Sequence, residues 1–122
     1  MNKNLIIVCA LGMLSIILGA FGAHALKDKL TPDALQSFET GVRYQIYHAI
    51  VLLFVNMFQG FSPEFKTTLT ITFLVGILFF SGSIYLIHLA KVPAKSIWFV
   101  TPLGGLILIV GWGMMLYHFI KS

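Results

Sequence analysis

The sequence predicts an all-α integral membrane protein, a four-helix bundle with an amphipathic interfacial segment between its first and second spans. Composition is the first observation behind this fold class. The 122 residues are 58% hydrophobic and only 10% charged, with a mean hydropathy of +0.94, whereas soluble domains carry roughly 25% charged residues. The second observation is that charged residues stand between four long apolar stretches. Each stretch is near the length of about 20 residues that a membrane-spanning helix needs.

The four apolar stretches define the expected spans within one transmembrane domain. The first follows Lys3 and contains no charged residue up to Leu26. Its start resembles a secretory signal, but the apolar run is long for a signal core, and we expect it to remain as a span. Gly60 and Pro63 are expected to end the second. The predicted spans are residues 4–26, 44–62, 67–90 and 101–120.

The connection between the first two spans carries its own helix signal. Thr31 and Pro32 supply a hydroxyl cap and a proline at the first helical position, and Asp33 places an acid near the positive end of the helix dipole. One face is apolar and the other polar up to about residue 43, which predicts an amphipathic helix over residues 32–43. No charge occurs from residue 44 to residue 63. The same helix, or a successor bent near Gly41, is therefore expected to continue as the second span.

A second cap-and-proline pattern, Thr101-Pro102, predicts that the fourth span begins near Pro102. Glycines recur within the spans, where small residues allow neighbouring helices to approach closely. The glycines that we expect at helix contacts are Gly12, Gly19, Gly22, Gly76, Gly82, Gly104, Gly105 and Gly111.

Polar side chains concentrate where the first span ends, the second begins and the third ends, and alternating direction through the bilayer brings these points to one side. Glu39 and Arg43 are four residues apart with the acid first, the favourable order for an ion pair on a helix. Ionisable groups at membrane depth often mark a functional site. Alternatively, side chains near span ends extend to the headgroups, and the pair fastens the interfacial helix. The candidate cluster is His24, Glu39, Arg43, Tyr44, Tyr47, His48 and His88.

Other chemistries lack their sequence patterns. The chain has no HExxH, no paired cysteine motif and no phosphate-binding glycine loop, so we expect no metal site, no cofactor and no enzymatic activity. Cys9 is the only cysteine, cannot form a disulfide within the chain, and is expected to be a buried, inert thiol. The net charge of +4 is scattered over span ends, which suits anionic lipid headgroups and not nucleic acid.

The basic residues also predict an orientation. Five of the eight lie on the side of the first and third connections and three on the side of the termini. The positive-inside rule therefore predicts that the two basic loops are cytoplasmic and that both termini lie outside.

Three motifs resemble one known family: GAFGAHALK at residues 19–27, FETGVRYQIYHA at residues 38–49, and TPLGG with a following GW at residues 101–112. Together they resemble the bacterial domain-of-unknown-function 423 family of small four-span inner-membrane proteins, over essentially the whole chain. The resemblance implies a plasma (inner) membrane protein and implies no biochemical activity.

The sequence thus predicts a multi-pass membrane protein in contact with the lipid bilayer. The leading hypothesis is a non-enzymatic accessory protein that recognises a partner or a lipid through the region of Glu39, Arg43 and His48. Whether the chain binds a different membrane protein or forms a homo-oligomer is left open by the sequence. The alternative is a small transporter or proton-coupled channel in which His24, His48 and His88 form part of a relay.

Overall fold

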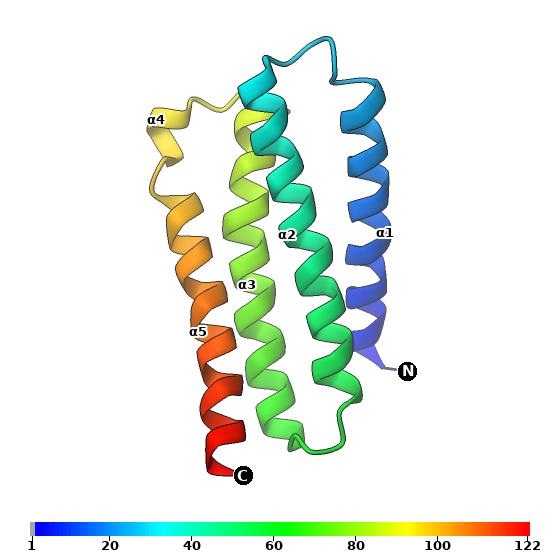
Figure 1. Cartoon of the computed structure of the whole chain (residues 1–122), viewed down its shortest axis with the longest axis vertical. Helices are drawn as coiled ribbons and strands as arrows, with labels where there is room; N and C mark the ends of the chain where they lie inside the picture. Colours follow the sequence, from blue (N-terminus) through cyan, green and yellow to red (C-terminus); the bar gives the residue numbers. More distant parts are fainter. Residues whose placement is uncertain (1) are drawn as a thin grey trace.

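A computed structural model describes residues 2–122, and every regular element in that range is helical. Four long helices lie side by side and alternate in direction, and one short helix stands between the third and fourth of them (Figure 1). The helices are α1 Lys3–His24, α2 Pro32–Met57, α3 Pro63–His88, α4 Ala94–Ile97 and α5 Val100–Lys121.

Three helical segments are long and apolar enough to cross a membrane: α1, α3 and the segment Ala94–Lys121 that contains α4 and α5. The all-helical membrane class is therefore confirmed. Helix α2 is as long as α3 but carries Asp33, Glu39 and Arg43 in its first half, and it does not reach the same hydropathy. That α2 is a fourth span thus stays a prediction.

Side-chain caps set the starts of the first three long helices. Thr31 accepts a hydrogen bond from the Ala34 backbone N–H at 3.2 Å, and Ser62 accepts one from Phe65 N–H at 3.1 Å; each cap precedes a proline. The segment expected to be an interfacial helix and the segment expected to be the second span form one continuous helix, α2, with Gly41 inside it.

The threonine cap expected at the start of the fourth span is wrong, although helix α5 starts within two residues of Pro102. Helix α5 begins at Val100, and no side chain caps it. The hydroxyl of Thr101 is hydrogen-bonded to that of Ser83 on α3, so it links two helices and does not cap one. The expectation that Cys9 is buried is also wrong. Cys9 is exposed on α1, because α1 packs on its neighbours along one side only.

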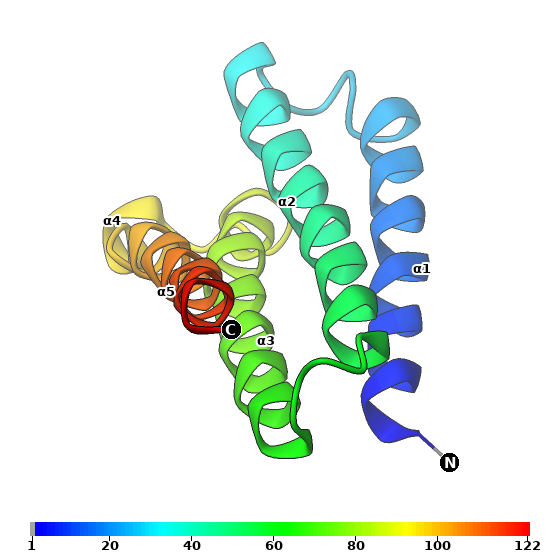
Figure 2. The ribbon, with the colours of Figure 1, turned by 60° about the horizontal axis from the view of Figure 1, so that its bottom comes forward.

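Successive long helices form the main interfaces: α1 packs against α2, α2 against α3, and α3 against α5. Within residues 2–122, α1 and α5 share no interface of similar extent, and Figure 2 shows them at opposite ends of the row. The central buried cluster draws on all four helices, through residues such as Val8, Leu52, Phe73 and Leu108.

The glycines expected at helix contacts differ in how closely a neighbour approaches. A methyl group on the Cα would lie under 3 Å from a neighbouring helix at Gly22, Gly76, Gly104 and Gly111. Gly104 is the tightest, because there the neighbour is the backbone of Phe79 and Phe80 on α3. Such close approach is how helices in lipid gain packing contact. An added methyl group would meet neighbours only at ordinary van der Waals distance at Gly19, Gly82 and Gly105. At Gly12 it would have no neighbour within 4 Å.

Candidate functional site

His48 is the buried member of the candidate cluster. It lies sixteen residues into α2, only 5% exposed, and both ring nitrogens are engaged. Nδ1 is 2.7 Å from the carbonyl oxygen of Tyr44, and the indole N–H of Trp112 on α5 donates to Nε2 at 3.1 Å. Because an indole nitrogen only donates, Nε2 is the acceptor and Nδ1 carries the proton. His48 is therefore a neutral imidazole that joins α2 to α5.

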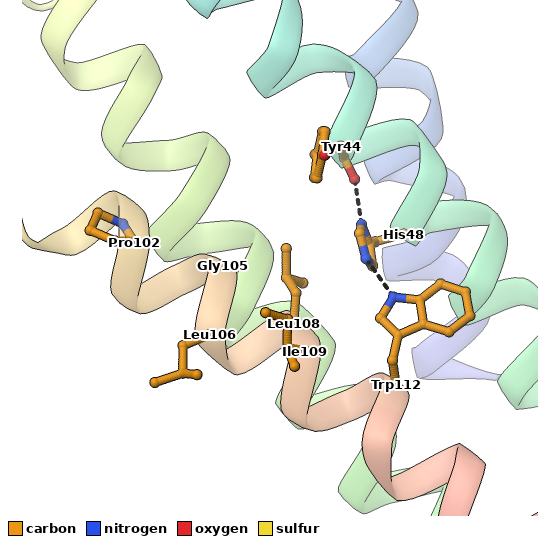
Figure 3. Close-up of a pocket in the computed structure, with 8 residues that line it drawn as sticks. All are labelled: Tyr44, His48, Pro102, Gly105, Leu106, Leu108, Ile109 and Trp112. Carbon is orange, nitrogen blue, oxygen red and sulfur yellow. Dashed lines mark hydrogen bonds between the residues drawn. The ribbon is translucent and has the colours of Figure 1, made fainter.

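A groove of about 500 Å³ lies beside this link, between α2 and α5 (Figure 3). Its wall on α2 is Tyr44 and His48, and its wall on α5 runs from Pro102 to Trp112. A second groove of about 420 Å³ shares Trp112 and continues along the same two helices past Phe54. Apart from the His48–Trp112 pair the lining is mostly apolar, so the two grooves suit a hydrophobic occupant.

Glu39 and Arg43 form an exposed pair. Their nearest charged atoms, Oε2 and Nη1, are 3.9 Å apart, and their side chains are 50% and 49% exposed. Arg43 also donates a hydrogen bond of 3.3 Å to the Thr40 hydroxyl. The pair lies on the outer surface of α2, where neither charge is enclosed by the rest of the chain.

Tyr44 and Tyr47 lie between this pair and His48. Their rings are 5.8 Å apart, and Tyr44 also stacks on His48 at 6.2 Å and contacts Phe80 on α3 at 4.9 Å. Both tyrosines are exposed by 40% or more. Five of the seven candidates are thus neighbours along α2.

The other two histidines do not join them. His24 is exposed at the end of α1 and His88 is half-buried at the end of α3, and among residues 2–122 no hydrogen bond or ring contact links either to His48. Gly41 of α2 packs against Ile84 of α3. His48 lies seven residues beyond Gly41, His88 lies four residues beyond Ile84, and the two helices run in opposite directions. At 1.5 Å per residue, His48 and His88 are about 16 Å apart along the helix axes.

Sequence reasoning missed a polar link at the centre of the fold. Gln45 is 1% exposed; its Nε2 donates to the Leu11 carbonyl on α1 at 2.9 Å, and its Oε1 accepts from the Tyr85 hydroxyl on α3 at 2.6 Å. One side chain thus joins three helices. The available signal was that Gln45 is a polar residue inside an apolar run. Because Gln45 is neither charged nor a histidine, it was not included in the candidate cluster.

A second amide, Asn56, performs the same role at the end that carries the termini. It accepts from Asn4 on α1 at 3.0 Å and donates to Thr70 on α3 at 3.1 Å. Lys66 donates to its backbone carbonyl at 3.3 Å. Two amide groups, Gln45 near the centre and the half-buried Asn56 near the end that carries the termini, therefore fix how α1, α2 and α3 are aligned along their axes.

Within residues 2–122, no group of three or more His, Cys, Asp or Glu side chains lies close enough together to hold a metal ion. The donors that do meet are single histidines, amides and hydroxyls whose partners are other protein groups.

These features define a class: a small multi-pass helical membrane protein whose buried polar side chains mostly join helices. The family model described as "Protein of unknown function (DUF423)" matches residues 18–105. The chain belongs to this family.

Named relatives agree with that assignment. A UPF0382 membrane protein of Haemophilus influenzae is 37% identical, over 99% of this chain and 96% of its own length. The UPF0382 inner membrane protein YgdD of Escherichia coli is 35% identical, over 96% of this chain and 88% of its own. YwdK of Bacillus subtilis, also a UPF0382 membrane protein, is 35% identical over 89% of each chain. No solved structure matches the chain.

Proposed function

We propose that this chain is a non-enzymatic protein of the plasma (inner) membrane that binds another membrane protein through the α2 polar face, which we define as Glu39, Arg43 and Tyr47. The supporting observation is that Glu39 and Arg43 are half-exposed beside segments of α1 and α3 that are apolar.

The depth of the α2 polar face follows from its neighbours. Gly22 and Gly19 of α1 lie against Phe38 and Val42 of α2, and Ile84 of α3 lies against Gly41. These contacts are roughly 3–8 Å inside the loop-side ends of α1 and α3. Because α1 and α3 are apolar enough to span the bilayer and run in the same direction, α2 returns between them. We therefore take α2 as the fourth span.

At that depth an uncovered ion pair is costly. A charged side chain at the centre of a spanning helix raises the insertion free energy by about 2.5–3.5 kcal/mol. The cost here is lower, because the pair lies nearer the end of the spans and Arg43 can extend toward the headgroups. A protein partner that supplies hydrogen bonds to the α2 polar face removes the exposure to lipid. Partner binding would therefore account for the presence of Glu39 and Arg43 at this depth, which the contacts within the chain do not explain.

A photo-crosslinking amino acid at position 47 tests this proposal in cells that express the chain. We expect a protein adduct at Tyr47 and none at Ile16, which lies on the outer face of α1 with 71% exposure. Arg43→Ala should abolish the adduct. Equal labelling at the two positions, or no protein adduct at Tyr47, would contradict partner binding.

We favour this role over proton transport because of the histidine geometry. A relay through three histidines needs short hops, whereas His48 is about 16 Å from His88 along the helix axes and both its ring nitrogens are engaged. Proton flux in vesicles that is lost with His48→Ala would reverse this preference.

The orientation that we propose places the loops of residues 25–31 and 89–99 in the cytoplasm, on the positive-inside rule. Single cysteines introduced at Lys29 and at Ser122, in a Cys9→Ser background, test it with a thiol reagent that does not cross membranes. We expect labelling of intact cells (outer membrane permeabilised where there is one) at position 122 only; labelling at position 29 only would invert the topology.

A further inference from the structure

An exposed seam runs the length of α2. Its members recur in alternating steps of four and three residues, the spacing with which two helices pack in a left-handed coiled coil. Six of the seven are exposed and Thr40 is partly exposed. We call them the α2 seam: Gln36, Thr40, Arg43, Tyr47, Ile50, Phe54 and Met57.

The seam divides into two halves. Toward the loop end it is polar, with Arg43 and the neighbouring Glu39, and toward the other end it is apolar, with Ile50 and Phe54 exposed by 57% and 46%. The apolar half also forms one wall of the groove of about 420 Å³ between α2 and α5. A helix lying on the seam would therefore contact both α2 and the edge of α5.

Membrane topology selects how a second copy can meet this seam. Two copies inserted in the same direction present α2 in parallel and at the same depth. The polar half of one seam then lies beside the polar half of the other, and the apolar halves meet likewise. An antiparallel arrangement, which would bury Arg43 against apolar side chains, does not arise between copies with one topology.

Charge on the α2 polar face is self-complementary in that parallel arrangement. Glu39 and Arg43 are one helical turn apart, and helical side chains lean toward the N-terminus, so Arg43 extends toward the level of Glu39. In a two-fold pair the two Arg43 side chains face each other across the axis, and each turns toward Glu39 of the other copy, so that the four charges sum to zero. The guanidinium has five N–H donors, and among residues 2–122 it makes one hydrogen bond, to Thr40, and a long 3.9 Å contact to Glu39.

We propose that the partner on the α2 polar face is a second copy of this chain, in a parallel two-fold dimer packed along the α2 seam. This rests on the proposed function, since it identifies the protein that covers Glu39 and Arg43. Reciprocal Glu39–Arg43 pairs fix the depth at which the two α2 helices meet, and Tyr47, Ile50 and Phe54 supply the packing contact.

Disulfide trapping tests the dimer with the purified full chain in vesicles of phosphatidylethanolamine and phosphatidylglycerol. In a Cys9→Ser background, Tyr47→Cys is compared with Ile16→Cys, a position of similar depth on α1. Oxidation should yield covalent dimer at position 47 and only collisional background at position 16. Equal yields at the two positions would overturn the proposal.

Charge variants test the reciprocal pairs. Glu39→Lys makes the α2 polar face wholly positive and Arg43→Glu makes it wholly negative. Each variant, carrying Tyr47→Cys and its own epitope tag, should lose the disulfide dimer when reconstituted alone. Mixing the two should restore a dimer that carries both tags. A yield that is unchanged in the single variants would overturn the pairing.

The two proposals can fail separately. If purified protein forms no dimer at position 47 while photo-crosslinking in cells captures a different membrane protein, the second-copy proposal is overturned and partner binding stands. If neither experiment gives an adduct, both are overturned. Folding of each variant is verified by its thermal melting in detergent, so that loss of dimer reports association.

Discussion

The indole N–H of Trp112 on α5 donates to Nε2 of His48 on α2 across 3.1 Å, which makes His48 part of the link between two helices and not a free proton carrier. Trp112→Phe removes the donor and retains an aromatic ring. We expect the free energy of unfolding in detergent to fall by about 0.5–2 kcal/mol. Trp98→Phe is the matched control, because Trp98 is 69% exposed and its ring lies edge-on to the neighbouring ring of Phe99. Equal losses in the two variants would contradict the link.

Gln45 and Tyr85 should be energetically coupled. Either Gln45→Leu or Tyr85→Phe breaks their 2.6 Å hydrogen bond and leaves a buried polar group without its partner, at an expected loss of about 1–2 kcal/mol each. The double variant should lose less than the sum by at least about 0.5 kcal/mol. Chemical or thermal unfolding of the four proteins in detergent measures the coupling, and strict additivity would argue against the bond.

Gly104 should tolerate no side chain. A methyl group there would meet the backbone of Phe79 and Phe80, so Gly104→Ala must separate α3 from α5, with an expected loss of about 1–3 kcal/mol. Gly113 on the same helix has no heavy atom within 4 Å of the added carbon. Gly113→Ala should therefore be neutral or stabilise by up to about 1 kcal/mol through helix propensity. If both variants melt at the same temperature, α3 and α5 do not approach each other at Gly104 as closely as the structure shows.

Arg43→Ala should leave the fold of the single chain nearly intact. Within residues 2–122, the polar contacts of Arg43 are to Glu39 and Thr40 on its own helix, so the substitution breaks no link between helices. We expect a loss well below the roughly 3–5 kcal/mol that breaking an enclosed pair costs. The melting temperature in detergent should therefore change little while adduct formation at Tyr47 is lost. A large drop in melting temperature would show that the pair is enclosed within the chain.

Much of the fold could be predicted from composition and helix signals. Apolar runs bounded by charges located the long helices, and Thr31-Pro32 marked the start of α2, because capping chemistry is local. The same pattern at Thr101-Pro102 indicated a cap that α5 does not have, because the Thr101 hydroxyl is hydrogen-bonded to Ser83 on α3. A contact between distant residues competes with the local cap and is not encoded in the spacing.

The candidate site was harder to predict for the same reason. Neighbours on α2, such as Glu39 and Arg43, follow from helical spacing. Contacts between helices depend on how each helix rotates and slides: His48 meets Trp112, a residue that the sequence did not single out for chemistry, and not His88. The expected convergence of histidines assumed that His48 lies near the start of a span, whereas residues 38–42 of α2 already pack against α1 and α3, so His48 lies deeper in the bundle.

The central claim is that the α2 polar face lies within the bilayer and is covered by protein. A nitroxide label on Tyr47→Cys, in a Cys9→Ser background and in membranes from expressing cells, tests it through collision with oxygen, which enriches in lipid, and with a water-soluble nickel complex. We expect low accessibility to both, whereas a label at Ile16 should be accessible to oxygen alone. Accessibility to nickel at position 47, or to oxygen at the level of position 16, would contradict the claim.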